Sequence, residues 1–379
     1  MVKETDDIQE KLDELIEISR FYGKNDEYVI AGGGNTSYKS EEKIWIKASG
    51  TSLANIDKDD FVCLSRSELR KISTKIYSQN SRIREARVKE DLQKAIISEN
   101  GKRPSVETSL HEIIEYKFIV HTHPTLVNAL MCSRKAKRLT RKLFGKHALF
   151  IEYTDPGYVL FKKVESSIIS YRERFSCEPK IIFLQNHGVF VSGDSPDEIK
   201  NQYTEIELIL KDQIDSQLPP NQGQLSEEYV HKQSKTIANQ LDIDPSHVCY
   251  RINGLIQKYT ISPDVFDQIS RPFTPDDIVY CKSNYLFTTS GLDSLKIDVT
   301  KFAERYGYLP KIIAVQGKGL VSIETGQQSP ATVMDVFENM MKVRYFSEIF
   351  GGPQFMNPEQ IDFIDNWEVE NYRRTVTGD

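Results

Sequence analysis

The spacing of apolar residues over the first part of the chain predicts one helix followed by short strands. Residues 8–22 carry apolar side chains three and four positions apart, a spacing typical of an amphipathic helix, and Gly23 lies just beyond its expected end. Three strand-like runs follow, at residues 27–31, 43–47 and 61–64. We therefore expect a sheet whose first strands run antiparallel. Charged residues with helical spacing then occupy positions 67–99.

Beyond this point, helical and strand-like patterns alternate, as they do in α/β folds. A helix is expected over residues 106–116 and a buried strand over residues 117–121. Further strands are expected at residues 149–152, 180–185 and 189–192, and further helices at residues 158–174 and 195–214. Residues 218–224 combine Pro, Asn and Gly without apolar periodicity, which predicts a boundary between a domain over residues 1–217 and a region over residues 218–379.

The region 218–379 is expected to be an α+β appendage with a structural or substrate-covering role. It contains further helical patterns and two strand-like runs near residues 311–323. A final helix is expected from about residue 329, with an apolar stripe formed by Val333, Val336, Phe337, Met340, Met341 and Val343. Such a stripe favours packing over a cofactor site, and we expect it to dock on the first domain or on a neighbouring subunit.

Two segments of the chain resemble each other. Residues 180–188 and 311–319 are identical at five of nine positions, and each is followed by a short strand, a Ser-Pro pair and a long helix. A degenerate duplication explains this pattern, and so does the chance similarity of strand–turn–strand–helix units with Gly at the turn. The segments differ where His187 of the first corresponds to Lys318 of the second.

Composition and charge exclude several classes of protein. The chain has 379 residues, of which 39% are hydrophobic and 27% are charged, values typical of folded globular proteins and not of disordered or fibrous chains. The formal net charge of −6, and the absence of an apolar run of ~20 residues, predict that neither nucleic acid nor a membrane is a partner. Five cysteines without a C-x-x-C motif favour reduced thiols and predict a cytoplasmic protein.

The segment 120–124 contains two histidines separated by one residue. Alternate residues of a strand point to the same face, so His121 and His123 can present both imidazoles to one metal ion. His187 lies at the end of another apolar strand, where a tight turn can bring it to the same edge of the sheet. An isolated H-x-H is more often an ordinary pair of buried or surface histidines, but the combination with His187 and Glu107 favours a catalytic divalent site with an open position.

Glu107 begins the predicted helix just before the histidine-containing strand, so the helix N-terminus can direct its carboxylate toward the metal. There the carboxylate can ligate the ion or act as a general base, and the two roles compete for one side chain. The alternative is a first-turn glutamate that is simply favoured by the helix dipole. His111, four residues on and on the same face, is expected to pack or to form a hydrogen bond.

Three segments gather glycines, hydroxyl side chains and amides where strands end or a helix starts. They are residues 32–37, 47–51 and 103–105. Backbone N–H groups at such places can hold a phosphate group, and simple hairpin turns are the alternative interpretation. The glycines at positions 32–34 precede a strand-like run instead of a helix, which argues against a dinucleotide-binding fingerprint.

Taken in order, five short motifs resemble those of the class II aldolase/adducin family. They are Gly33-Gly-Asn-Thr-Ser37, Lys47-Ala-Ser-Gly50, Pro104-Ser-Val-Glu107, Val120-His-Thr-His-Pro124 and Asn186-His-Gly188. The resemblance covers residues 1 to about 215. The segment 45–51 and the tail 311–373 are more narrowly similar to the aldolase portion of bifunctional rhamnulose-1-phosphate aldolase/dehydrogenase proteins.

The resemblance implies a three-layer α/β/α sandwich around a mainly antiparallel sheet, assembled as a homo-oligomer and usually as a tetramer. It implies Zn²⁺ or another divalent ion, held by His121, His123 and His187. Glu107 would be the acid/base that moves a proton at the carbon next to the substrate carbonyl.

The resemblance also implies a site for the phosphate of a small sugar phosphate. Its residues would be Asn35, Ser37, Ser49, Gly50 and Ser105. Val106 departs from the family pattern, because many phosphate-using members carry a second serine there, and a tight phosphate grip is correspondingly in doubt. The family's proton-donating tyrosine has no clear match, and Tyr153 is a catalytic candidate by its location alone.

The function that the resemblance implies is metal-dependent cleavage of a ketose 1-phosphate to dihydroxyacetone phosphate and an aldehyde. The ion would polarise the ketose carbonyl and stabilise the enediolate that remains after the carbon–carbon bond breaks. Epimerase, dehydratase and decarboxylase activities on a sugar phosphate use the same chemistry and stay open as alternatives. A non-catalytic interaction module like adducin is a further alternative, against which the three histidines and Glu107 argue.

Overall fold

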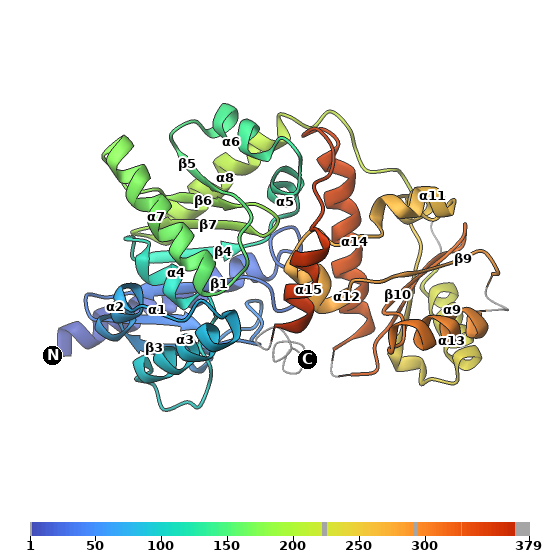
Figure 1. Cartoon of the computed structure of the whole chain (residues 1–379), viewed down its shortest axis with the longest axis horizontal. Helices are drawn as coiled ribbons and strands as arrows, with labels where there is room; N and C mark the ends of the chain where they lie inside the picture. The colour runs from blue at the N-terminus through green and yellow to red at the C-terminus, as the bar shows by residue number, and fades with distance from the viewer. Residues whose placement is uncertain (1, 222–225, 292–294, 327, 368–379) are drawn as a thin grey trace. The chain divides into compact units, whose positions relative to one another are not determined.

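Residues 2–221, 226–291, 295–326 and 328–367 are described by the computed structural model of the chain. Their contacts separate two units (Figure 1). The first contains the described residues up to Asp212 except 132–134, and the second contains 132–134 and the described residues from Gln213 onward. The sequence predicted a boundary in the segment 218–224, of which residues 222–224 lie outside the described residues.

The first unit is built on a seven-stranded sheet. Its strands are β1 (Asn35–Lys39), β2 (Lys43–Lys47), β3 (Phe61–Ser65), β4 (Phe118–Thr122), β5 (Ala148–Ile151), β6 (Ile181–Leu184) and β7 (Gly188–Gly193). They lie in the order β3-β2-β1-β4-β7-β6-β5, and each neighbouring pair is antiparallel except β5 and β6. The expectation of a mainly antiparallel sheet is therefore confirmed.

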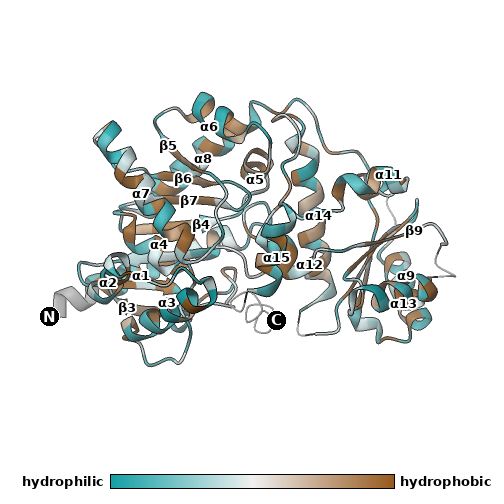
Figure 2. Cartoon of the chain, in the orientation of Figure 1, coloured by the Kyte–Doolittle hydropathy of each residue, from teal (hydrophilic) through white to brown (hydrophobic). Residues whose placement is uncertain are grey.

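Helices cover both faces of this sheet, so the first unit has the three layers that the resemblance implies (Figure 1). One face carries α1 (Val2–Gly23), α5 (Thr125–Met131) and α8 (Pro196–Lys211), and the other carries α2 (Arg66–Thr74), α3 (Ser81–Ala95), α4 (Thr108–Ile113) and α7 (Tyr158–Phe175). A further helix, α6 (Ala136–Phe144), packs beside β5. On the second face the alternate strand residues Ile44, Ile119 and Ile182 are buried in one core with Leu110 of α4 and Phe161 of α7. Figure 2 shows the apolar character of β6 and β7.

The strand expected at residues 27–31 is wrong, because this segment forms turns and the first strand begins at Asn35. Ala31 and Gly34 have left-handed backbones, with φ of +55° and +67°, which an extended strand cannot accommodate. The carbonyl of Tyr28 instead accepts a hydrogen bond from the N–H of His123, at 3.1 Å. The segment therefore lies against the end of β4 as a loop.

The second unit has its own four-stranded sheet, in agreement with the predicted α+β appendage. Its strands are β8 (Val248–Arg251), β9 (Leu286–Thr288), β10 (Ile312–Val315) and β11 (Gly319–Ile323), in the order β8-β11-β10-β9. Its helices are α9 (Glu227–Leu241), α10 (Gly254–Tyr259), α11 (Pro263–Phe266), α12 (Pro275–Cys281), α13 (Leu295–Tyr306), α14 (Pro330–Ser347) and α15 (Pro358–Asn366). The sequence predicted β10 and β11 but missed β8 and β9, since runs of four and three residues carry little periodicity.

The apolar stripe of α14 packs inside the second unit, against α12 and against strands β8 and β11. Its members are fully or almost fully buried there, including Val333, Phe337 and Met341. The expectation that this stripe docks on the first domain or on a neighbouring subunit is therefore wrong. Among the helices of the described residues, none combines the length and the apolar character needed to cross a lipid bilayer.

Candidate metal centre and active site

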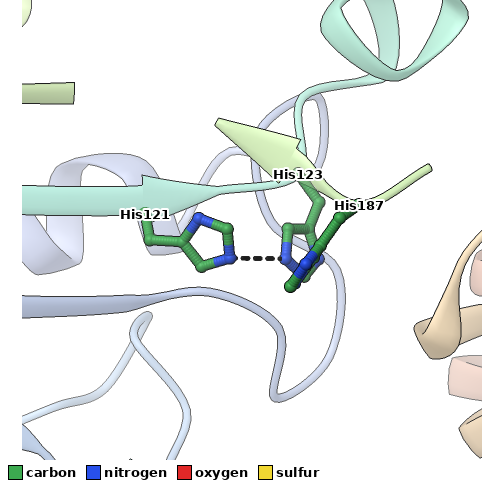
Figure 3. A group of neighbouring side chains, drawn as sticks. All are labelled: His121, His123 and His187. Atoms are coloured by element: carbon green, nitrogen blue, oxygen red, sulfur yellow. Dashed lines mark hydrogen bonds between the residues drawn. The ribbon is translucent and has the colours of Figure 1, made fainter. Parts of the chain in front are cut away.

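Three imidazole side chains come together at one place in the first unit (Figure 3). His121 lies near the end of β4, His123 directly follows this strand, and His187 lies in the turn between β6 and β7. One ring nitrogen of each histidine lies within 4.8 Å of the corresponding nitrogens of the other two. The two histidines that the H-x-H motif supplies and the distant third are thus neighbours.

The hairpin between β6 and β7 explains why His187 reaches the other two. Leu184 pairs with Gly188, so residues 185–187 form a tight loop. Asn186 in this loop has a left-handed backbone with φ of +55°, which asparagine tolerates better than most residues. Because β7 pairs with β4, this loop lies beside the end of the strand that carries His121.

The donor atoms suit a divalent ion. Nδ1 of His121 donates to the carbonyl of Val189 at 3.0 Å, so the neutral ring presents the lone pair of Nε2. Burial lowers the pKa of His121 well below its usual value, which keeps the ring neutral. Nε2 of His121 and Nε2 of His123 lie 3.0 Å apart. Two nitrogen ligands of one tetrahedral Zn²⁺ ion are separated by ~3.3 Å, so the donor set fits such an ion.

Glu107 faces this cluster from the start of α4. Its Oε2 lies 3.5 Å from Nε2 of His121, and its Oε1 lies 3.4 Å from Nε2 of His187. Oε1 is buried and accepts no hydrogen bond within the described residues. Burial raises the pKa of this carboxyl, but His121, His187 and the amide of Asn35 outweigh burial and lower the pKa to about 2. The result is an ionised carboxylate beside three imidazoles, where it can ligate an ion or carry a proton.

Asn35 of β1 connects Glu107 to His111, and Ser37 of the same strand holds the other side of the His111 ring. Nδ2 of Asn35 donates to Oε2 of Glu107 at 2.6 Å, and Oδ1 of Asn35 is hydrogen-bonded to Nε2 of His111. Nδ1 of His111 lies 2.7 Å from the hydroxyl of Ser37. All four side chains are buried. His111 thus has the hydrogen-bonding role that its spacing from Glu107 indicated.

The residues proposed for phosphate binding divide into two groups. Ser49, Gly50 and Ser105 lie together, because the N–H of Ser49 donates to the carbonyl of Arg103 at 2.8 Å and Ala48 pairs with Pro104. The hydroxyl of Ser105 also accepts from the N–H of Glu107, at 3.2 Å, which ties this group to the carboxylate. Asn35 and Ser37 are buried in β1 and hydrogen-bonded to His111, and Asn35 also donates to the carboxylate of Glu107.

Tyr153 lies near the loop that carries His187, since its N–H donates to Oε1 of Gln185 at 3.1 Å. Its phenolic oxygen is buried and forms no hydrogen bond within the described residues. Burial and the neighbouring Asp155 raise the pKa of this phenol. The catalytic role of Tyr153 therefore stays a prediction.

Gly34 is a residue of the site that sequence reasoning did not single out for this role. A Cβ atom at this position would lie 2.6 Å from the carbonyl oxygen of His121, and the backbone φ is +67°. Only glycine combines this close approach with a left-handed backbone. The run of three glycines before β1 was the available signal, and it indicated a turn without revealing what lies opposite.

The C-terminal end of α4 is held by a buried lysine. The ammonium of Lys39 donates to the carbonyls of His111, at 2.8 Å, and Ile114. Burial lowers the pKa of Lys39 to about 7. A lysine that donates to the last carbonyls of a helix satisfies groups that the helix itself leaves unpaired. The helix that carries Glu107 is thus fixed at its far end.

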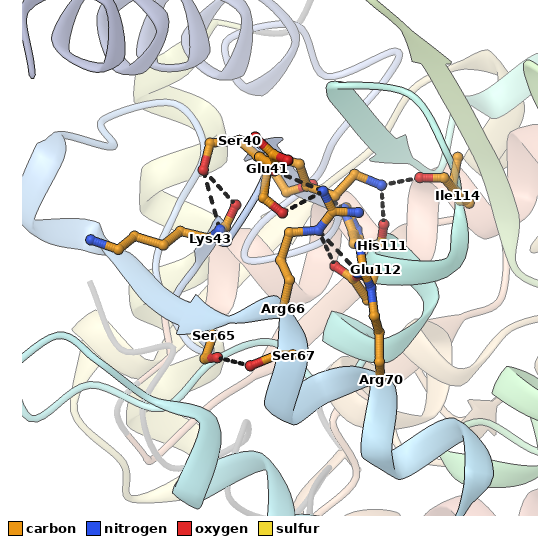
Figure 4. Close-up of polar contacts among 12 residues, drawn as sticks. Ser40, Glu41, Lys43, Ser65, Arg66, Ser67, Arg70, His111, Glu112 and Ile114 are labelled. Atoms are coloured by element: carbon orange, nitrogen blue, oxygen red, sulfur yellow. Dashed lines mark hydrogen bonds and ion pairs between the residues drawn. The ribbon is translucent and has the colours of Figure 1, made fainter. Parts of the chain in front are cut away.

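Ion pairs fix the same helix to α2. Arg66 and Arg70 of α2 contact the carboxylate of Glu112 of α4, with closest distances of 2.9 Å and 3.2 Å (Figure 4). Glu112 and Arg66 are largely buried, whereas Arg70 is mostly exposed. Partly buried pairs of this kind restrict the orientation of the helix more than exposed ones do, because water screens them less.

Residues 13–214 match the family model of the class II aldolase and adducin N-terminal domain. An uncharacterized oxidoreductase, YuxG, of Bacillus subtilis (strain 168) is 25% identical over 193 residues, which cover 48% of this chain and 27% of that protein. The chain thus spans about a quarter of this relative. The methylthioribulose-1-phosphate dehydratase of Microcystis aeruginosa (strain NIES-843 / IAM M-2473) is 24% identical over 199 residues, covering 48% of this chain and 85% of that protein.

Solved structures of this family are also similar to the chain. The N-terminal class II aldolase domain of a conserved protein from Thermoplasma acidophilum has 25% identity and a TM-score of 0.45, covering 53% of this chain and 92% of that one. The L-fuculose-1-phosphate aldolase of Thermus thermophilus has 16% identity and a TM-score of 0.34, covering 52% and 90%. The narrower resemblance to bifunctional rhamnulose-1-phosphate aldolase/dehydrogenase proteins stays a prediction.

Proposed function

The chain belongs to the class II aldolase and adducin family, and from this premise we propose that it is a metal-dependent aldolase. In this proposal it cleaves a ketose 1-phosphate to dihydroxyacetone phosphate and an aldehyde. The observation that carries the proposal is the buried carboxylate of Glu107 beside three imidazoles. Burying an ionised carboxylate is costly, so a protein that used this fold only for interactions would have no reason to bury these groups together.

His121, His123 and His187 are the proposed ligands of one divalent ion, Zn²⁺ by the chemistry of three nitrogen donors with an open position. When bound, the ion supplies positive charge that polarises a substrate carbonyl. The protein holds the rings ready for this role. His121 is fixed by its hydrogen bond to Val189 and by stacking on Phe190, with ring centroids 4.1 Å apart.

Glu107 is the proposed carrier of the proton at carbon. In the cleavage direction a hydroxyl loses its proton as the aldehyde forms, and the electrons of the broken carbon–carbon bond stay on the dihydroxyacetone phosphate half. The ionised carboxylate of Glu107 takes up that hydroxyl proton and delivers it to the carbon from Oε1, the oxygen without a hydrogen bond within the described residues. Tyr153 is our candidate for the family's proton-donating tyrosine, from its place in the sequence alone.

The substrate phosphate is proposed to lie where the end of β2 meets the segment before α4. Ser49 and Ser105 offer hydroxyl groups there, and Gly50 has a left-handed backbone with φ of +82°. Val106 contributes no hydroxyl. The resemblance also implies Asn35 and Ser37, which instead hydrogen-bond to Glu107 and His111.

A dehydratase acting on a sugar phosphate is the second candidate, and an epimerase or a decarboxylase would use the same scaffold. The relative named as a methylthioribulose-1-phosphate dehydratase favours the dehydratase among these, because the match covers 85% of that protein. Such an enzyme would also use Glu107 to move a proton next to a carbonyl, but it would release water and keep the carbon chain intact.

We further propose a homotetramer in the cytoplasm, with a structural or substrate-covering role for residues 218–379. The five cysteines are free thiols, which supports a reducing compartment. The histidines of the second region are His231 and His247. Neither belongs to the histidine cluster found in the described residues, and we propose that this region binds no metal of its own.

Two measurements test the proposal. Elemental analysis of the purified protein should find one divalent ion per chain. Incubation of the loaded protein with fuculose 1-phosphate, rhamnulose 1-phosphate and other ketose 1-phosphates should release dihydroxyacetone phosphate and an aldehyde from at least one of them. Release of water with an intact carbon chain would replace the aldolase by the dehydratase, and a protein that binds no ion would contradict both.

A further inference from the structure

The sheets of the two units share one topology. In the first unit β4 pairs with β7, β7 with β6, and β6 with β5, and the last of these pairs is parallel. In the second unit β8 pairs with β11, β11 with β10, and β10 with β9, and again the last pair is parallel. The chain order of these strands is the same in both, with α7 and α13 at the parallel crossover and α8 and α14 after the last strand.

The correspondence extends to single residues. Leu184 pairs with Gly188 in one hairpin, and Val315 pairs with Gly319 in the other, so both loops have the same length. Three backbone hydrogen bonds of the first unit recur at matching positions of the second. Ser192 N–Lys180 O corresponds to Ile323 N–Lys311 O, and Gln185 N–Ile151 O corresponds to Gln316 N–Thr288 O. Asn186 N–Met131 O corresponds to Gly317 N–Thr260 O. Chance similarity of two hairpins does not reproduce their pairing with two further strands in the same register.

The register identifies what stands at the metal-ligand positions of the second unit. His121 pairs with Phe190, which lies two residues after Gly188. In the same way Tyr250 pairs with Val321, which lies two residues after Gly319. By the same count Ile252 corresponds to His123, and Lys318 corresponds to His187. None of the three residues of the second unit is a usual ligand of a divalent ion at neutral pH, since the ammonium of lysine is protonated.

The surroundings of Gly319 in the second unit match those of Gly188 in the first. A Cβ atom at Gly188 would lie 2.5 Å from the carbonyl oxygen of Thr122, and one at Gly319 would lie 2.7 Å from that of Arg251. The side chain nearest to the Cβ position at Gly188 is the imidazole of His123. At Gly319 it is the ring of Tyr250, which lies 3.0 Å from the Cβ position there. The hydroxyl of Tyr250 donates to the carbonyl of Lys318, the residue that replaces His187.

We propose that residues 248–347 are a second copy of the metal-binding half of the first unit, and that the copy keeps the backbone of a metal site without its ligands. Tyr250 fills the place of a ligand imidazole and bonds to the turn that a ligand would otherwise reach. In this proposal the second unit has the backbone that a metal site needs, and what it lacks is the three ligand side chains. Restoring those side chains should create a site for a divalent ion.

The test is the combined variant Tyr250→His, Ile252→His and Lys318→His in the full chain, titrated with Co²⁺. Its visible absorption should report one tetrahedral ion more per chain than the parent binds. A control with Arg251→His in place of Ile252→His carries the same number of histidines, but points one of them to the opposite face of β8. The control should bind no additional ion.

A folded variant that takes up no more Co²⁺ than the parent, or a control that takes up as much, would overturn the proposal. Circular dichroism reports whether the variants fold. If the loss of Tyr250 prevents folding, the pair Ile252→His and Lys318→His is compared with the pair Arg251→His and Lys318→His. The first pair should then bind Co²⁺ more tightly than the second, and equal affinities would contradict the proposal.

A second inference rests on the proposed function and concerns how Glu107 is oriented. The amide of Asn35 donates from Nδ2 to the carboxylate, so its Oδ1 can only accept, and Nε2 of His111 must carry the hydrogen between them. Burial lowers the pKa of His111 to about 3 and leaves the ring neutral. Nδ1 is then a lone pair, and the hydroxyl of Ser37 donates to it.

Each hydrogen bond of this series is therefore donated in the same direction: Ser37 donates to His111, His111 donates to Asn35, and Asn35 donates to Oε2 of Glu107. The series occupies Oε2 and leaves Oε1 as the oxygen without a hydrogen bond within the described residues. We infer that His111 and Asn35 are positioning residues, which hold Glu107 so that Oε1 carries the proton. Asn35 then serves the carboxylate, and not the substrate phosphate.

Nuclear magnetic resonance of the metal-free protein tests the proton positions without any substrate. ¹⁵N shifts should show His111 as the neutral tautomer protonated at Nε2, and a ring protonated at Nδ1 would overturn the inference. This measurement needs neither metal nor turnover, so its result does not depend on whether the protein is an aldolase. A failure of the positioning inference can therefore be told apart from a failure of the proposed function.

Kinetics test the consequence. His111→Phe keeps the size of the ring without its hydrogen bonds and should lower kcat about 10- to 100-fold, with metal content and KM unchanged, because partners behind the reacting groups have effects of this size. His111→Gln keeps a donor toward Asn35 and should restore most of the loss. For Asn35→Ala we expect the same fall in kcat. A raised KM with unchanged kcat would instead make Asn35 a phosphate ligand and contradict the inference.

Discussion

Gly188 leaves no room for a Cβ atom beside His123. An atom built at that position lies 2.6 Å from Cδ2 of His123 and 2.5 Å from the carbonyl oxygen of Thr122. The backbone at Gly188 does not require glycine for its φ, so the requirement is steric. Position 188, directly after the proposed ligand His187, therefore requires glycine because two strands and an imidazole meet there.

We predict that Gly188→Ala weakens metal binding. The added methyl group must displace His123 or separate β7 from β4, and either movement spoils the geometry of the three nitrogens. Isothermal titration with Zn²⁺ should show at least a ten-fold loss of affinity. Gly193→Ala, at the other end of β7, would meet the side chain of Glu198 at 2.9 Å and should cost stability without affecting the ion. Equal affinities for the two variants would contradict this account.

The three histidines should each be needed for the ion. His121→Ala, His123→Ala and His187→Ala remove one nitrogen donor apiece, and we expect each purified variant to hold far less than one ion per chain after dialysis against a weak chelator. His147→Ala is the matched control, because His147 is an exposed histidine of the same unit. Elemental analysis checks the result. Retention of a full equivalent by His121→Ala and His187→Ala would remove the metal site from the proposal.

Glu107→Gln should keep the ion and lose turnover. The amide has nearly the shape of the carboxylate but cannot accept a proton, and groups that transfer protons contribute ~10²–10⁴-fold to a rate. We therefore expect kcat to fall within that range while metal content stays at one per chain. Glu152→Gln alters an exposed glutamate that pairs with Lys137, and it should leave kcat unchanged. A Glu107→Gln enzyme with normal turnover would reduce this residue to a helix-capping role.

The layers of the first unit were expected from the resemblance to the class II aldolase/adducin family, whereas individual strands and the histidine cluster were predicted from local signals. Strand periodicity located β4 and β7, and H-x-H with a histidine at a turn carries its own chemistry. The sequence could not show that Gly188 and Gly34 stand against the histidine strand, because this depends on the residues opposite them. It also could not reveal that Asn35 bonds to Glu107, since these residues lie 72 positions apart.

The errors have physical causes as well. Residues 27–31 have strand-like composition, but the left-handed backbones at Ala31 and Gly34 turn the chain before a strand can form. The stripe on α14 is a packing face, as its spacing predicts, yet periodicity says nothing about which surface covers it. Tyr153 is no such error: it stays a prediction that rests on its position alone.

The buried Lys39 should make stability depend on pH. Its pKa falls from 10.5 to about 7 on folding, chiefly through burial, with Glu112, Glu115, Arg66 and Arg70 as the charged groups around it. Between pH 7 and pH 10 the unfolded chain therefore binds a proton that the folded chain does not, so the free energy of unfolding rises with pH. The slope reaches ~1.4 kcal/mol per pH unit for one such group.

Lys39→Met isolates this effect. Below pH 7 both states of the parent bind the proton, and the difference in unfolding free energy between parent and variant should be constant. From pH 7 to pH 9 the difference should shift in favour of the parent, as measured by urea unfolding. Lys117→Met, which alters an exposed lysine at the start of β4, should show no such shift. A parent and a Lys39→Met variant with parallel pH profiles would mean that the buried lysine keeps its proton.

The last prediction separates phosphate binding from the positioning of Glu107. Ser105 accepts from the N–H of Glu107 and keeps its own hydroxyl proton to donate, and Ser49 is half-buried beside it. A hydrogen bond to a charged group is worth about 1.5–3 kcal/mol, so Ser49→Ala should raise KM for a ketose 1-phosphate about 10- to 100-fold. It should leave KM for the unphosphorylated ketose unchanged. Ser37→Ala should lower kcat and leave both KM values alone, because the Ser37 hydroxyl is directed at His111. Steady-state kinetics on the two substrates decide between these outcomes, and a KM effect of Ser37→Ala confined to the phosphorylated substrate would return Ser37 to the phosphate site.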